Sequence, residues 1–155
     1  MVNKDRRAAV MVIHGPNLNL LGRREPNIYG HGTLDELNKK IAETAQRLNI
    51  RVEIRQSNHE GEIIDLIQAA GGEFDGLIIN AAAFTHYSLA IRDALAAIEI
   101  PAVEVHLSNI YQREDFRRQS VIAPVVRGQI AGFGPESYLL ALRAAVALIN
   151  GGDGE

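Results

Sequence analysis

Apolar runs of strand length alternate along this chain with segments of helical periodicity, and no other feature of the sequence constrains the fold as much. Residues 8–13 (AAVMVI) are continuously apolar, as a strand buried on both faces of a parallel sheet requires. Residues 76–80 and 102–106 predict two further buried strands, and residues 128–132 predict a last one. Residues 51–56 alternate between polar and apolar side chains, which predicts a half-exposed strand at an edge of the sheet.

Four helices are predicted between and after these strands. The first begins at Thr33, because Glu36 lies three residues further on, which is the spacing of a capping box. Ser57 and Glu60 repeat that spacing before a second helix. The other two helices are expected at residues 89–98 and 135–150.

This alternation predicts an α/β fold, a doubly wound five-stranded parallel sheet with helices on both faces and right-handed crossovers. For five strands we expect the flavodoxin-like order 2-1-3-4-5. The 155 residues match the length of one domain, and no linker or low-complexity segment interrupts them. We therefore expect a single catalytic domain over residues 1–155, with flexible tails at residues 1–8 and 151–155.

The composition excludes several classes of function. The chain has no cysteine, which excludes disulfides, thiolate metal sites and cysteine nucleophiles and favours a reducing compartment. Its net charge of −3 includes no broad basic run, so we expect no nucleic-acid partner. The first residues do not resemble a signal peptide, and the last predicted helix is interrupted by Arg143 and too short to cross a bilayer. We expect a cytoplasmic protein without a membrane partner.

Polar side chains stand where the buried strands end, which is where ligands bind in sheets of this kind. His14 follows the first apolar run, and Asn80 and His106 end two later strands. A phosphate-accepting receiver domain needs aspartates at these positions, and no glycine-rich nucleotide-binding motif is present. The histidines lack the spacing of a zinc site. We therefore expect no metal and no cofactor.

Lysine chemistry is also excluded, because Lys4, Lys39 and Lys40 all lie away from the strand ends and none can form a Schiff base there. Acid–base chemistry by tyrosine, histidine and arginine remains, on a small anionic or polyhydroxylated substrate. The alternative is a non-enzymatic flavodoxin-type module that holds a flavin or an anion. The segment GFGPE at residues 132–136 could bind an anion at a helix start. An aromatic content of 5% without tryptophan counts against a flavin.

Four blocks of the sequence, spread from about residue 10 to residue 150, resemble one known family. They are HGPNLNLLGRREPNIYG, INAAAFTHYSLAIRDAL, EVHLSN and REDFRRQSVIAPVVRGQIAGFG. In order and spacing they resemble type II 3-dehydroquinate dehydratase. The resemblance implies a flavodoxin-like fold, assembly into a homododecamer built as a tetramer of trimers, and cofactor-free dehydration of 3-dehydroquinate to 3-dehydroshikimate in the shikimate or quinate pathway.

The resemblance also implies catalytic roles. Tyr29 resembles the base that takes a proton from the carbon beside the substrate ketone. Arg24 resembles the charge that lowers the tyrosine's pKa from near 10, by about 1–3 units. Asn17 resembles the residue that stabilises the resulting enolate through water. His106 resembles the acid that protonates the departing tertiary hydroxyl. Glu104, a carboxylate two residues before it, is expected to orient its ring.

Substrate-binding roles follow from the same resemblance. Asn80 and the backbone amides of Leu107 and Ser108 are expected to hold the substrate carboxylate. His86 and Arg117 are expected to hold the ring hydroxyls.

Two further residues resemble members of the site, and three histidines do not. Asp93 resembles a residue that reaches the site of the adjacent subunit, and Arg113 one on the rim. His14, His31 and His59 match no functional position and are interpreted as structural.

Overall fold

Five parallel strands form the centre of the molecule, paired in the order β2-β1-β3-β4-β5. They are β1 (Ala9–His14), β2 (Arg51–Gln56), β3 (Gly76–Asn80), β4 (Ala102–His106) and β5 (Gly128–Ala131). The computed structural model describes residues 6–23, 25–29 and 32–151. The predicted order of the strands is confirmed, and the alternating strand β2 lies at an edge of the sheet.

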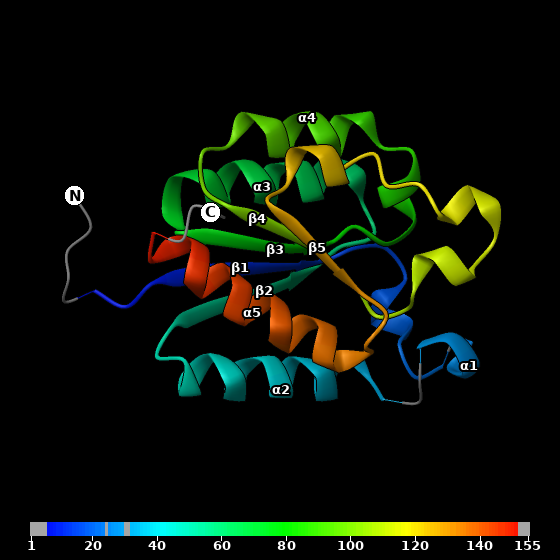
Figure 1. Ribbon diagram of the computed structural model, residues 1–155, viewed down its shortest axis with the longest axis horizontal. Coiled ribbons are helices and arrows are strands. Elements are labelled where there is room, and N and C mark those ends of the chain that lie inside the picture. The colour runs from blue at the N-terminus through cyan, green and yellow to red at the C-terminus, as the bar shows by residue number, and fades with distance from the viewer. Residues whose placement is uncertain (1–5, 24, 30–31, 152–155) are drawn as a thin grey trace.

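Two helices cover each face of the sheet (Figure 1). On one face lie α2 (Leu34–Arg47) and α5 (Pro135–Ile149), and on the other α3 (Glu60–Glu73) and α4 (Leu89–Ala97). A further single-turn helix, α1 (Pro26–Tyr29), lies in the loop after β1, where the sequence predicts only a polar, glycine-rich stretch. None of the helices in the described residues is long and apolar enough to span a bilayer.

Successive side chains of the central strands point to opposite faces of the sheet, and this divides the core into two layers. In β1, Val10 and Val12 pack with α2 and α5, whereas Met11 and Ile13 pack with α3 and α4. All four are 2% exposed or less. Burying a side chain of this size contributes about 1.5–3 kcal/mol, so strands apolar on both faces hold the helices against the sheet.

A threonine side chain fixes the start of α2, but the serine predicted to start α3 does not cap it. The Thr33 hydroxyl accepts a hydrogen bond from the Glu36 backbone N–H at 3.2 Å, which confirms the predicted start of α2. The capping box predicted at Ser57 is wrong. Its hydroxyl accepts from the His59 N–H at 3.0 Å in a turn before α3, and His59 is the N-cap residue. The serine hydroxyl bonds within a local turn that spans only two residues, so it does not cap the first turn of the helix.

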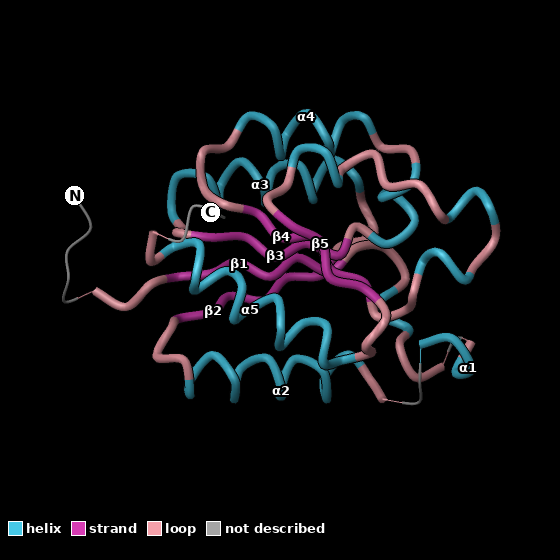
Figure 2. The backbone as a smooth tube through the Cα atoms, viewed as in Figure 1, coloured by secondary structure: helices cyan, strands magenta, loops and turns pink. Residues whose placement is uncertain are grey.

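The carboxyl ends of the strands meet at one edge of the sheet. His14 of β1 lies in register with Asn80 of β3, and His106 ends β4 two strands away from β1. After His14 the chain needs glycine, because a Cβ on Gly15 would lie 2.7 Å from the carbonyl carbon of Ala81. Beyond this edge Figure 2 shows loops and short helices gathered together.

Three short 3-10 helices lie among these loops beyond the carboxyl edge of the sheet. The sequence predicts residues 107–127 only as a long polar segment. It folds into η3 (Ile110–Gln112), η4 (Asp115–Arg117) and η5 (Ala123–Val125). Their turns carry the arginines that the sequence assigns to the site.

Candidate active site

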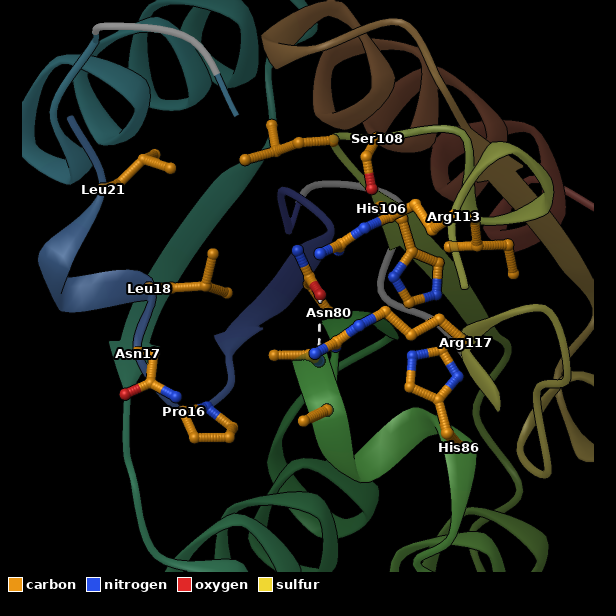
Figure 3. Close-up of a pocket in the computed structure, with 14 residues that line it drawn as sticks. Pro16, Asn17, Leu18, Leu21, Asn80, His86, His106, Ser108, Arg113 and Arg117 are labelled. Carbon is orange, nitrogen blue, oxygen red and sulfur yellow. Dashed lines mark hydrogen bonds between the residues drawn. The ribbon is translucent and has the colours of Figure 1, made fainter. Parts of the chain in front are cut away.

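A pocket opens beyond the carboxyl ends of β1, β3 and β4. It contains eight of the eleven residues assigned to the site from the sequence: Asn17, Asn80, His86, His106, Leu107, Ser108, Arg113 and Arg117. Figure 3 shows Asn80 between Asn17 and Leu18 on one side and His106, Arg117 and His86 on the other. Residues up to a hundred positions apart in the chain therefore share one cavity.

Of the other three assigned residues, one lies outside this cavity and two fall wholly or partly outside the described residues. Asp93 lies on α4, exposed and away from the pocket. Arg24 lies outside the described residues. The backbone of Tyr29 ends α1, and its side chain is outside the description. Its neighbour Ile28 lines a second hollow that shares Arg113 with the main pocket.

His106 is held by a buried carboxylate. His106 and Glu104 are two residues apart on β4, so their side chains lie on the same face of the sheet. The Nε2 atom of His106 is 2.6 Å from Oε2 of Glu104, which is fully buried. Ser120 donates to the same carboxylate at 2.9 Å and Gln129 at 3.2 Å. A carboxylate fixed in this way holds the hydrogen of the ring on Nε2 and leaves Nδ1 to the pocket.

His86 presents an acceptor rather than a charge. Its Nδ1 lies 2.8 Å from the backbone carbonyl of Gln119, which can only accept. Burial lowers the pKa of His86; the Gln119 bond opposes this shift, and coulombic interactions with His106, Arg117 and Arg113 add to it. A neutral ring with its hydrogen on Nδ1 turns an Nε2 lone pair toward a ligand hydroxyl.

Two arginines supply the positive charge of the pocket. The Arg117 side chain is held by Glu114, whose Oε2 accepts from Nε at 2.7 Å. Arg113 forms an ion pair with Glu25 at 3.7 Å, which links the pocket to the segment directly before α1. Because arginine stays charged at every working pH, an anionic ligand is favoured here.

Two asparagines lie at this edge, one in the loop beyond β1 and the other at the end of β3. Asn17 has a left-handed backbone (φ 70°), and its N–H donates to the Asn58 side chain at 2.9 Å. Asn80 is 4% exposed, and its Oδ1 accepts from the Ala82 N–H at 3.0 Å. Ala82 also has a positive φ of 52°, which is a strained conformation for alanine.

Together these groups offer hydrogen-bond donors, acceptors and positive charge to a small polar anion. Within residues 6–23, 25–29 and 32–151, no three acidic or histidine side chains gather closely enough to hold a metal ion. The side chains that line the pocket offer hydrogen bonding, ion pairing and proton transfer.

Comparison with known proteins identifies the family. The model of a family described as dehydroquinase class II matches residues 8–146. The chain belongs to this family. It is thus an enzyme of the type II 3-dehydroquinate dehydratase family, as the four sequence blocks predicted.

Members of the class II dehydroquinase family align with nearly all of the chain. The 3-dehydroquinate dehydratase of Pelotomaculum thermopropionicum is 60% identical over 139 residues, which is 90% of this chain and 96% of that protein. The one from Gloeothece citriformis is 62% identical over 142 residues, 92% and 93% of the two chains. The crystal structure of type II dehydroquinase from Butyrivibrio crossotus superposes with a TM-score of 0.89 at 50% identity, covering 90% of this chain and 98% of that one.

Three residues behind the pocket of this class II dehydroquinase were not singled out from the sequence. His14 was interpreted as structural, and Tyr138 and Asn38 lie within predicted helices. In the structure the three join one buried hydrogen-bonded chain that ends on Asn80. The only sequence signal was a histidine beside a strand end, because the partners lie 24 and 124 residues away from it.

Proposed function

We propose that the protein dehydrates 3-dehydroquinate to 3-dehydroshikimate by anti elimination through an enolate, in the shikimate or quinate pathway. The observation that carries this proposal is the His106–Glu104 pair, 2.6 Å apart, at the wall of a pocket that also holds Asn80 and Arg117. It combines a proton-transfer group with groups that bind an anion. The matching family and relatives named 3-dehydroquinate dehydratase support the same reaction.

Tyr29 is the proposed base, and Arg24 the charge that makes its phenolate accessible. The phenolate takes the proton from the carbon beside the ketone, and the C–H electrons form the enolate. The Arg113–Glu25 ion pair supports this assignment, because it ties the segment before α1 to the pocket wall. We assign Asn17, which lines the other side of the pocket, to stabilise the enolate oxygen through a water molecule.

His106 is the proposed acid. The enolate electrons return to form the new C=C bond as the tertiary C–O bond breaks, and the leaving oxygen takes a proton from Nδ1 of His106 and departs as water. Glu104 stabilises the positive imidazolium that carries this second ring proton. The proton taken by Tyr29 and the proton given by His106 balance, so the enzyme returns to its starting state through solvent exchange.

Substrate binding is assigned to the remaining groups of the pocket. Asn80 and the backbone amides of Leu107 and Ser108 receive the carboxylate. His86, neutral with Nε2 as an acceptor, and Arg117 take the ring hydroxyls. Each hydrogen bond to the charged carboxylate is worth about 1.5–3 kcal/mol. Arg113 stands at the rim, shared with the second hollow.

The proposal extends to assembly. Asp93 is exposed on α4, and Leu89 of the same helix is 63% exposed, as surface residues of a subunit contact are. We propose that Asp93 reaches the site of the adjacent subunit in a homododecamer, a tetramer of trimers, and that the enzyme works in the cytoplasm as a single catalytic domain. Equilibrium sedimentation should give a mass twelvefold that of one chain.

The direct experiment is incubation of purified protein with 3-dehydroquinate in the presence of EDTA, while the ultraviolet absorption of the conjugated enone is followed. The absorption should rise without added metal or cofactor. Tyr29→Phe should abolish most of the turnover, and the core variant Ile67→Val, on the far face of the sheet, should keep it. No enone signal from correctly folded wild type, or turnover that stops in EDTA and returns with a divalent cation, would overturn the proposal.

A further inference from the structure

A buried chain of hydrogen bonds runs behind the pocket and ends on Asn80. The Asn80 Nδ2 group donates to the Tyr138 hydroxyl at 3.0 Å. That hydroxyl lies 3.0 Å from Nδ1 of His14, and Nε2 of His14 lies 2.8 Å from Oδ1 of Asn38. Tyr138 and His14 are both 0% exposed, so neither can exchange these partners for water. The chain joins α5, β1 and α2 to one side chain of the pocket.

Only one direction of donation satisfies every member of this chain. The Ala82 N–H is a donor, so it fixes the Asn80 oxygen and turns the Asn80 NH₂ group toward Tyr138. The Tyr138 oxygen therefore accepts, and its own hydrogen donates to Nδ1 of His14. The ring of His14 then carries its hydrogen on Nε2, which donates to Oδ1 of Asn38. Every step follows from a backbone N–H that cannot reverse.

The members of the chain are uncharged over the working pH range. Burial lowers the pKa of His14 to about 4, against a smaller opposing effect of its bond to Asn38. Burial likewise raises the pKa of the Tyr138 hydroxyl well above its usual range, although the Asn80 bond opposes this. The ring of His14 also packs on that of Tyr138, with centroids 5.2 Å apart. A neutral and tightly packed chain of hydrogen bonds can orient the Asn80 amide but does not supply protons.

We propose that Tyr138 and His14 are positioning residues that lock the Asn80 amide, so that its second N–H points to the substrate carboxylate. Asn80 uses one N–H on Tyr138 and its oxygen on Ala82, and the other N–H faces the pocket. Without Tyr138 the amide is held at one end only. The inference rests on the proposed role of Asn80 in binding 3-dehydroquinate.

The test is Tyr138→Phe, which removes the hydroxyl and keeps the buried ring. Loss of one oriented bond to a charged carboxylate should raise the KM for 3-dehydroquinate about 10-fold and leave kcat within about twofold. The inhibition constant of a carboxylate-bearing competitive ligand should rise equally. Ile67→Val, a buried control on the other face of the sheet, should lower the urea midpoint without changing KM.

A double-mutant cycle separates this inference from the proposed function. In an Asn80→Ala background, Tyr138→Phe should change KM no further, because the group it positions is gone. An equal rise of KM in both backgrounds would overturn the positioning role, as would a fall of kcat with KM unchanged. If Asn80→Ala itself leaves KM unchanged, the assignment of Asn80 to the substrate fails instead.

Asn38→Ala gives a second variant in case Tyr138→Phe folds poorly. Asn38 is half-buried at the far end of the chain and does not line the pocket. Its removal frees the ring of His14 and should raise KM about twofold to threefold, again only while Asn80 is present. An unchanged KM in this variant would contradict the proposal that the hydrogen-bonded chain positions Asn80.

Discussion

His14 and His106 occupy equivalent places in the sheet and differ in their partners. Each is the last residue of its strand, β1 or β4, and each is 5% exposed or less. His14 contacts a hydroxyl and an amide oxygen, both neutral. His106 contacts the carboxylate of Glu104 at 2.6 Å.

The partner decides what each ring can do. Two neutral partners cannot offset the cost of burying a charge, so the pKa of His14 falls to about 4 and its ring stays neutral. His106 contacts a buried carboxylate instead, and a carboxylate partner is what a histidine acid uses, which is why we propose His106 and not His14 as the acid. One edge of a sheet can thus carry a proton donor and a fixed positioning group of the same residue type.

The largest expected effect is on turnover at His106. His106→Ala should lower kcat about 10²–10⁴-fold, the usual contribution of a general acid or base. Steady-state kinetics on 3-dehydroquinate measures it, with Ile67→Val as the control. A loss of affinity with kcat retained would make His106 a binding residue, and the contrast with His14 would disappear.

The next effect concerns stability and pH. In the unfolded chain a histidine has a pKa of about 6.5, so as the pH falls below that value the unfolded state binds the proton and folded His14 does not. The neutral ring of His14 therefore contributes to the free energy of unfolding above pH 6.5, and this contribution is lost as the pH falls toward 4. At pH 4.5 the loss is about 2–3 kcal/mol. Urea unfolding at pH 7.5 and 4.5 should show this loss in wild type and a smaller one in His14→Gln. Identical losses in the two proteins would show that His14 is not the titrating group.

Removal of the charge beside His106 sharpens the comparison. Glu104→Gln keeps the shape of the side chain and removes its charge, so His106 acquires a neutral partner, as His14 has. We expect kcat to fall about 10-fold to 10²-fold, less than when the acid itself is lost. If kcat stays normal at neutral pH, the carboxylate is not what distinguishes the two histidines.

The smallest effect is expected at Gln129. Its amide donates to Glu104 at 3.2 Å, beside the shorter bonds from Ser120. One such bond is worth about 0.5–1.5 kcal/mol, so Gln129→Leu should lower kcat by less than about 10-fold. A loss as large as that of Glu104→Gln would mean that Gln129, rather than Glu104, controls the ring.

The sequence predicts the sheet and most of the pocket, because strand-length apolar runs and the strand-end rule are local signals. Asn80 and His106 were found in this way, and Thr33 marks its helix start correctly. Ser57 misled, because a two-residue turn and a helix cap have the same local pattern. The Tyr138–His14 contact joins residues 124 positions apart, and Tyr138 looks like any core residue of an apolar helix. Asp93 does not line the pocket of its own chain, so the role proposed for it depends on a second subunit.

Steady-state kinetics of Tyr138→Phe and Glu104→Gln, measured side by side, tests most directly whether the partner sets the role of each histidine. Tyr138→Phe removes the hydroxyl partner of His14, and Glu104→Gln makes the partner of His106 neutral; each substitution keeps the shape of the side chain nearly unchanged. Tyr138→Phe should raise KM with kcat retained, and Glu104→Gln should lower kcat with KM nearly constant. Changes of the same parameter in both variants would contradict the division of roles.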